Sequence, residues 1–107
     1  MQKPFILAAL LGIAMTPAQA DDIALFAAGS LKEALSDVAA DYTEAYATPV
    51  ATSFGSSGLM RERIETGEAA HVFASANMRH PKTLEAAGKG GPVALFARNR
   101  LCALARP

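Results

Sequence analysis

The sequence predicts an α/β fold with a mainly parallel sheet and helices on both faces. Short apolar runs, each four to six residues long, alternate with longer segments whose apolar residues recur at helical spacing. Glycine or proline lies at most of the boundaries between them. Such a β-α-β-α-β-α-β order is typical of a parallel sheet that is covered on each side.

The first residues resemble an export signal. Lys3 precedes an apolar run over residues 5–15, and Ala18-Gln19-Ala20 is a small-x-small cleavage site. The run is too short to span a bilayer stably, although a buried N-terminal helix is the alternative. We therefore expect residues 1–20 to be a signal peptide, cleaved after Ala20, and residues 21–107 to form one α/β lobe in the periplasm.

Composition excludes some partners. Without Lys3, nine Lys and Arg face ten Asp and Glu, so the exported part is almost neutral and has no electrostatic attraction for nucleic acid. Cys102 is the only cysteine, which rules out an internal disulfide. We expect it to pack as a small apolar side chain.

The first strand is predicted at Ile23–Ala27, a short apolar run. A helix should follow from Ser30, because Ser30 and Glu33 form the S-x-x-E capping box. Apolar residues then recur every three or four positions and predict one buried stripe. The stripe comprises Leu31, Leu35, Val38, Tyr42 and Ala45.

The second strand is predicted at Val50–Phe54, after Pro49. Residues 55–58 (Gly-Ser-Ser-Gly) are expected to turn into a short helix over Leu59–Thr66, closed by Gly67.

A third strand is expected at His71–Ala76 and a third helix at Pro81–Ala87, ending before Gly88. Two further strands are predicted from apolar character at Val93–Ala97 and Leu101–Ala105.

Two strand-to-helix junctions suggest an anion site. Residues 27–31 and 54–59 both combine small residues with a hydroxyl at a helix start, at Ser30 and Ser57. Backbone N–H groups at such starts bind anions. Neither junction contains Lys, Arg or His, so the donors are neutral, and neither contains a carboxylate to accept a proton. This pattern favours a small, fully ionised oxyanion.

Other interpretations stay open at this point. Ser30 and Ser57 could simply be N-caps. Residues 55–58 are one residue shorter than the G-x-S-x-G motif of serine hydrolases, and no acid neighbours His71 or His80 in the sequence. No Cys or His cluster has metal-ligand spacing, and no cofactor motif is present.

Three segments together resemble the periplasmic molybdate-binding proteins of ABC transporters, a type II periplasmic-binding-protein family. They are Phe26-Ala27-Ala28-Gly29-Ser30-Leu31, Ser53-Phe54-Gly55-Ser56-Ser57-Gly58 and Ala70-His71-Val72-Phe73-Ala74-Ser75-Ala76-Asn77. The resemblance implies two α/β lobes that close on an oxyanion. It also implies that Ser30 and Ser57 each donate a hydroxyl and a backbone N–H to the ligand, with Ser56 as a further neighbour.

Two positions depart from the family pattern. His71 and Asn77 stand where the family usually has Asp. Neither position is a principal anion donor, so the departures concern the subfamily and the packing of the lobe, and they leave open another small ligand.

The resemblance implies the solute-binding component of an uptake transporter: a monomer without enzymatic activity that binds molybdate or tungstate and delivers it to a membrane permease. No residue would ligate the metal directly; Ser30 and Ser57 would contact the oxygens of molybdate. The second lobe is expected beyond Pro107, so residues 21–107 alone should bind weakly. A ligand-free remnant or interaction domain is the alternative, and a serine hydrolase is a more distant one.

Overall fold

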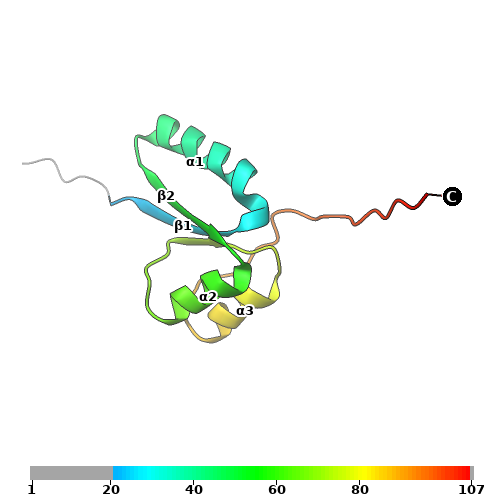
Figure 1. Cartoon of the computed structure of the whole chain (residues 1–107). Coiled ribbons are helices and arrows are strands. Elements are labelled where there is room, and N and C mark those ends of the chain that lie inside the picture. The colour runs from blue at the N-terminus through cyan, green and yellow to red at the C-terminus, as the bar shows by residue number, and fades with distance from the viewer. Residues whose placement is uncertain (1–20, 107) are drawn as a thin grey trace, which may run out of the picture.

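The structure is a computed structural model that describes residues 21–106; the predicted signal peptide, residues 1–20, lies outside the described part. Three parallel strands form one sheet in the order β2-β1-β3, from β1 (Ile23–Ala28), β2 (Val50–Gly55) and β3 (Val72–Ala74). Figure 1 shows α1 (Lys32–Tyr46) on one face and α2 (Ser57–Glu65) and α3 (Arg79–Ala86) on the other. The predicted fold class is confirmed. No helix between residues 21 and 106 combines the length and apolar character that crossing a bilayer requires.

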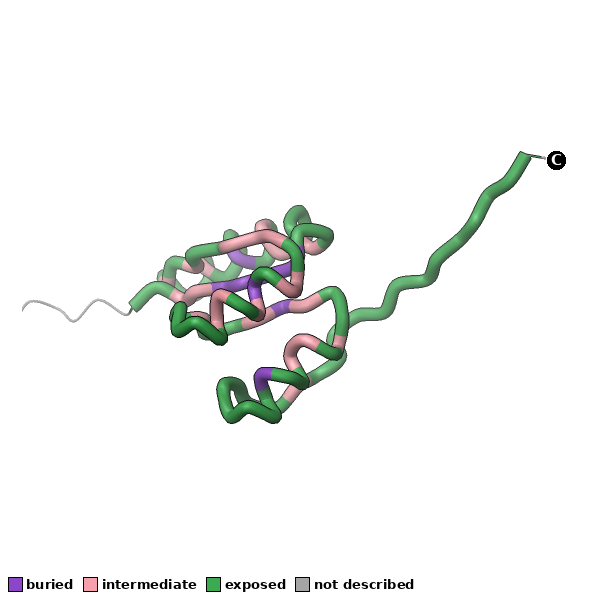
Figure 2. The backbone as a smooth tube through the Cα atoms, turned by 60° about the horizontal axis from the view of Figure 1, so that its bottom comes forward, coloured by how far each residue is buried: buried purple, intermediate pink, exposed green. Residues whose placement is uncertain are grey.

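The core lies on the central strand. Four consecutive β1 residues, Leu25 to Ala28, are buried, because helices cover both faces of the strand and other strands flank both edges. Met60 of α2 and Ala74 of β3 are buried as well. Figure 2 shows the buried stretch of the sheet in purple.

The junction after β1 differs from its prediction. A 3₁₀ turn, η1 (Gly29–Leu31), continues directly from the strand, and α1 begins only at Lys32. Neither Ala28 nor Leu31, the residues at the two N-cap positions, makes a side-chain cap. The predicted capping box of Ser30 and Glu33 is therefore wrong, because Ser30 lies inside the turn and lacks the position of an N-cap.

Helix α2 begins two residues earlier than predicted. Ser56 is the N-cap, with extended backbone (φ −63°, ψ 143°), and its hydroxyl accepts a hydrogen bond from the Leu59 amide. Ser57 is thus the first helical residue, so the interpretation of Ser57 as an N-cap is wrong.

Both short helices end in the same way. Gly67 (φ +103°) follows α2 and Gly88 (φ +68°) follows α3, each in a backbone conformation that L-residues rarely adopt. After α2 the Gly67 and Glu68 amides donate to the carbonyls of Ile64 and Arg63, which is a Schellman motif. The predicted role of Gly67 is confirmed.

The apolar stripe of α1 is only partly buried. Leu31 and Leu35 pack against the core, whereas Val38 is 58% exposed and Tyr42 is 39% exposed. The helix runs along β2, one of the two edge strands of this sheet, and residues 21–106 offer nothing further to cover the rest of the stripe.

The predicted strands at Val93–Ala97 and Leu101–Ala105 are not formed. Residues 91–106 carry no helix or strand, and Leu101 and Leu104 are almost fully exposed. Strand formation needs a paired neighbour, and these segments pair with no strand in the described region. Cys102 is also exposed, contrary to its predicted packing.

Candidate functional site

The three junctions after the strands gather at one edge of the sheet. Ala28 is paired with Gly55 at the ends of β1 and β2, and Ala27 is paired with Ala74 near the ends of β1 and β3. Because the strands are parallel, η1, the start of α2 and the loop after β3 lie at the same end of the molecule (Figure 1). The two serine-bearing loops therefore share an edge, as an anion site between them requires.

In open α/β sheets, ligands bind in a crevice at the carboxyl edge, between neighbouring strands whose following helices lie on opposite faces. The helix after β1 lies on one face, and the helix after β3 lies on the opposite face. A crevice is expected between two such neighbouring strands, outside their carboxyl ends.

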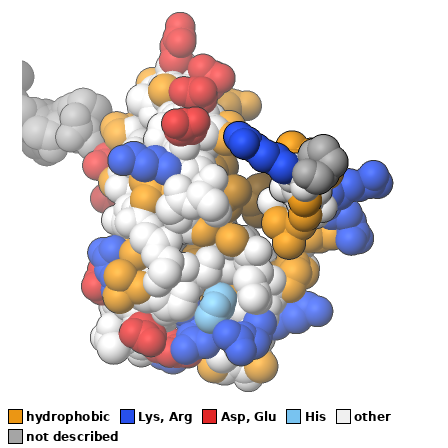
Figure 3. Space-filling view, turned by 45° about the vertical axis from the view of Figure 1, so that its right-hand side comes forward, with side chains coloured by type: hydrophobic (Ala, Val, Ile, Leu, Met, Phe, Trp, Pro, Cys, Tyr) orange, Lys and Arg blue, Asp and Glu red, His pale blue; other side chains and the backbone are white. Residues whose placement is uncertain are grey.

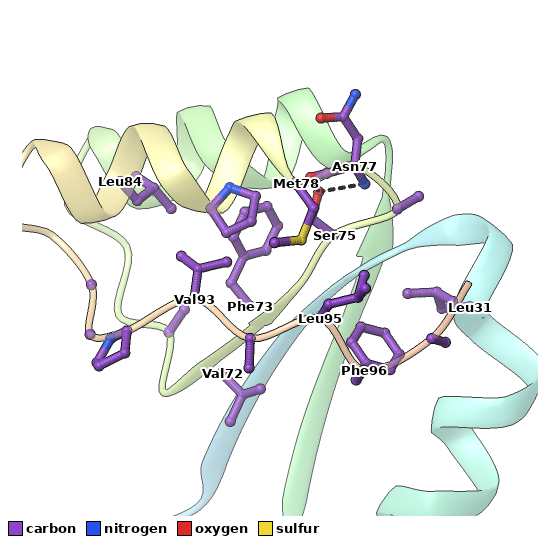
Figure 4. Close-up of a pocket in the computed structure, with 18 of the residues that line it drawn as sticks. Leu31, Val72, Phe73, Ser75, Asn77, Met78, Leu84, Val93, Leu95 and Phe96 are labelled. Atoms are coloured by element: carbon purple, nitrogen blue, oxygen red, sulfur yellow. Dashed lines mark hydrogen bonds between the residues drawn. The ribbon is translucent and has the colours of Figure 1, made fainter. Parts of the chain in front are cut away.

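A groove of about 700 Å³ runs beside β3, from Ala70 and His71 before the strand to the β3–α3 loop and Ser30 at the carboxyl edge, and α3 and the extended segment 89–99 form its other walls. Figure 4 shows apolar side chains such as Phe73, Val93 and Leu95 around it, with Ser75 and Asn77 near one end.

Ser30 lies on the wall of this groove. It is exposed, and no described residue makes a hydrogen bond with its hydroxyl. The two junctions lie close together at this point: a Cβ added to Gly29 would be 3.8 Å from the Gly55 carbonyl oxygen, an ordinary van der Waals contact. Ser30 can thus present its hydroxyl and backbone to a ligand at the carboxyl edge.

Ser57 is connected to the groove through the β3–α3 loop. It does not line the groove, but its Oγ accepts a hydrogen bond of 3.1 Å from the backbone amide of Ala76, which does. Accepting this bond uses a lone pair and leaves the hydroxyl proton available for donation. This contact could not be predicted locally, because the two residues are 19 positions apart. The third family segment, which contains Ala76, was its only sequence signal.

The neighbouring serines have other partners. Ser56 Oγ accepts from the Leu59 amide at 3.2 Å, as the cap of α2. Ser75 Oγ donates to the Asn77 carbonyl at 2.7 Å and accepts from the Asn77 amide at 3.2 Å. Although Ser75 lines the groove, its proton is already donated within the loop.

Both departures from the family pattern retain an acceptor. His71 Nδ1 accepts a hydrogen bond from the Ala24 amide at 2.8 Å. Asn77 Oδ1 accepts from the Arg79 amide at 2.7 Å, at the start of α3. Each side chain therefore makes a bond that a carboxylate could make, without the negative charge.

Acidic side chains predominate on α1, whereas α2 and α3 carry charges of both signs. Figure 3 shows acidic side chains gathered at the top of one face, whereas basic side chains lie at its left, bottom and right, with a further acidic group near the bottom. Helix α1 carries Asp37, Asp41 and Glu44, whereas α2 and α3 carry Arg61, Arg63, Arg79 and Lys82 together with Glu62, Glu65 and Glu85. Lys89 and Arg98 line the groove, so its field favours an anion.

The ion pair of Arg63 and Glu68 shifts the pKa of both side chains. Hydrogen bonding to Arg63 lowers the pKa of Glu68, and the same contact raises the pKa of Arg63. Neither residue lines the groove. Among residues 21–106, no group of three or more His, Cys, Asp or Glu is arranged to hold a metal ion.

Comparison with known protein families gives a match over nearly all of the described chain. The model of bacterial extracellular solute-binding proteins matches residues 23–107. An uncharacterized protein of Pasteurella multocida (strain Pm70), PM1146, is 38% identical over 82 residues, which are 77% of this chain and 34% of that protein.

A solved structure is also similar. It is the substrate-binding domain of a protein assigned to a molybdenum ABC transporter of Clostridium difficile, with a TM-score of 0.58 and 28% identity. The match covers 62% of this chain and 29% of that one. The chain thus spans about a third of the length of the proteins that it matches.

Proposed function

Because this chain belongs to the family of bacterial extracellular solute-binding proteins, we propose that it binds a tetrahedral oxyanion, molybdate or tungstate, for an ABC uptake transporter. The similar Clostridium difficile domain, assigned to a molybdenum transporter, supports the choice of ligand. The family also supports delivery to a membrane permease from the periplasm, after cleavage of residues 1–20.

The position of Ser30 and Ser57 carries the proposal. Both follow strands whose ends are paired, Ala28 with Gly55, so their hydroxyls and helix-start amides lie at one edge. Hydrogen bonds to a charged acceptor contribute about 1.5–3 kcal/mol each, so a few such donors suffice for specific binding. Ser56 is a secondary candidate, since its hydroxyl also caps α2.

We further propose that residues 21–107 are one lobe of a two-lobe binding protein. The relatives are about three times as long, which leaves room for a second α/β unit. The open side of the groove beside Ser30 would then face the second lobe, which would supply the remaining donors. The lobe alone would bind weakly, because many donors to the anion would be missing.

A thermal-shift screen tests the function. The extended form, meaning this chain continued through the downstream reading frame to the relatives' length, is heated with molybdate, tungstate, sulfate or phosphate. Ligands that bind the native state raise the melting temperature. Molybdate and tungstate are expected to raise it most. A shift with none of the four anions would contradict the proposal.

A further inference from the structure

We propose that His80 and Arg61 form a pH-sensitive contact between α3 and α2: the neutral imidazole of His80 holds α3 against α2, and protonation of His80 in mild acid releases α3. The inference concerns the packing of two helices and does not depend on the proposed function.

The contact joins two helices that are separated in the sequence. Arg61 of α2 and His80 of α3 are 19 positions apart, and Arg61 Nη1 lies 3.2 Å from His80 Nδ1 in a partly buried place. A Cβ added to Gly58 would be 3.7 Å from His80 Cε1, so the imidazole lies directly on α2. The two side chains therefore meet within the α2–α3 interface.

The guanidinium of Arg61 determines which form of the imidazole fits. A guanidinium has five N–H donors, no acceptor and a permanent positive charge. His80 Nδ1 can take part in this hydrogen bond only as the acceptor, which places the proton of the neutral ring on Nε2. Protonation adds a hydrogen at Nδ1, so the bond is lost and two positive groups face each other at close range.

No carboxylate offsets a positive charge on His80. Between residues 21 and 106, the ion pairs join Arg61 to Glu65, with Nε 3.4 Å from Oε1, and Arg63 to Glu68; neither includes His80. Protonated His80 would thus face Arg61 without a counter-charge of its own. The charged residues of the two helices are Arg61, Glu62, Arg63 and Glu65 of α2, and Arg79, Lys82 and Glu85 of α3.

Helix α3 depends on this interface. It has eight residues, of which only Leu84 is buried, and its main packing partner is α2. A helix of this length is not stable alone in water, so its stability comes from packing. Loss of the contact should therefore open α3 locally, while α1, on the opposite face of the sheet, stays packed (Figure 1). Because Pro81 and Leu84 line the groove, the opening also displaces one of its walls.

The direction of the pH dependence follows from the acceptor role of Nδ1. Histidine side chains change charge between about pH 5 and 8. The contact stabilises α3 while His80 is neutral, so its contribution is present at the upper end of this range and disappears as the pH falls. His71 Nδ1 also accepts a hydrogen bond, from the Ala24 amide, so a test must separate the two histidines.

Amide hydrogen exchange of the native chain tests the inference. Protection factors, which remove the intrinsic effect of pH on exchange, are measured at about pH 8 and about pH 5.5, the range in which histidine titrates. We expect the protection of the Leu84 amide in α3 to fall at least fivefold relative to that of Ala39 in α1. A native chain in which Leu84 and Ala39 keep the same relative protection would overturn the inference.

Two variants identify the groups responsible. In His80→Asn, Oδ1 can accept from Arg61 at every pH, and the side chain does not titrate. Arg61→Met removes the guanidinium but keeps an unbranched side chain. The extra loss of protection at Leu84 should disappear in both variants, although His71 is unchanged. The same loss in His80→Asn as in the native chain would assign the effect to another group and overturn the role of His80.

The tautomer of His80 provides a measurement that needs no variant. The nitrogen chemical shifts of the imidazole at about pH 8, where histidine is neutral, distinguish a protonated from an unprotonated Nδ1. We expect the proton on Nε2. A proton on Nδ1 would show that His80 does not accept from Arg61, and the inference would fail.

Discussion

His71 and Ala24 form two hydrogen bonds with each other at the start of the β1–β3 pairing. The Ala24 amide donates to His71 Nδ1 at 2.8 Å, and the His71 amide donates to the Ala24 carbonyl at 2.9 Å. The imidazole thus lengthens the pairing of β3, which has only three residues, Val72–Ala74. An acceptor at residue 71 anchors the edge strand that precedes the candidate site.

Removing this acceptor should weaken the fold. His71→Ala is expected to lower the free energy of unfolding by about 1 kcal/mol, the usual net contribution of one hydrogen bond. His71→Asp and His71→Asn, which can accept from the Ala24 amide, should lose less. Urea unfolding of the three variants measures the difference. Equal losses in all three would show that the bond contributes nothing.

The glycines that end the short helices should resist substitution. Gly67 and Gly88 have φ of +103° and +68°, so Gly67→Ala and Gly88→Ala should each cost about 1–2 kcal/mol of stability. Gly91→Ala is the control, because no atom lies within 4 Å of its added Cβ and its φ is not positive. Thermal unfolding compares the three; a control that loses as much would refute the backbone argument.

The sequence predicted the elements better than their exact limits and contacts. The run that became β1 was identifiable because a central parallel strand is continuously apolar, and β2 was identifiable as a short strand-like run after Pro49. Which of Ser56 and Ser57 caps α2 was not identifiable, since the choice depends on backbone angles that place Ser56 in the extended region.

Strand pairing was the feature that the sequence-based predictions most often missed. Residues 93–97 have strand-like composition, but a strand also needs a neighbour, and that depends on distant parts of the chain. Strand pairing also determined which parts of the candidate site could be predicted from the sequence. The two serine junctions could be predicted locally, whereas the Ala76 amide reaches Ser57 only because β3 lies beside β1 in the sheet.

The ion pair of Arg63 and Glu68 should make stability depend on pH in acid. The guanidinium lowers the pKa of Glu68 below its ordinary 4.5. A carboxylate with a lowered folded pKa contributes stability above its unfolded pKa, and the contribution disappears as the pH falls through the folded value. Glu68→Gln should therefore be less stable than native protein at pH 7 and equally stable near pH 2.

Glu62→Gln serves as the control for this experiment, because Glu62 makes no ion pair with any residue between 21 and 106. Urea unfolding at several pH values gives the difference between each variant and the native chain. If the deficit of Glu68→Gln were the same at pH 7 and pH 2, the ion pair would not be its cause.

The serines should separate into ligand donors and a helix cap. In the extended form, Ser30→Ala and Ser57→Ala are each expected to weaken molybdate binding at least tenfold, since each removes a hydrogen bond to charge worth about 1.5–3 kcal/mol. Ser56→Ala should instead lower stability by about 1 kcal/mol, the usual cost of losing an N-cap, with a smaller change in affinity. Calorimetry measures the affinities and urea unfolding the stabilities. Native affinity in both Ser30→Ala and Ser57→Ala would contradict the assignment of these two hydroxyls as ligand donors.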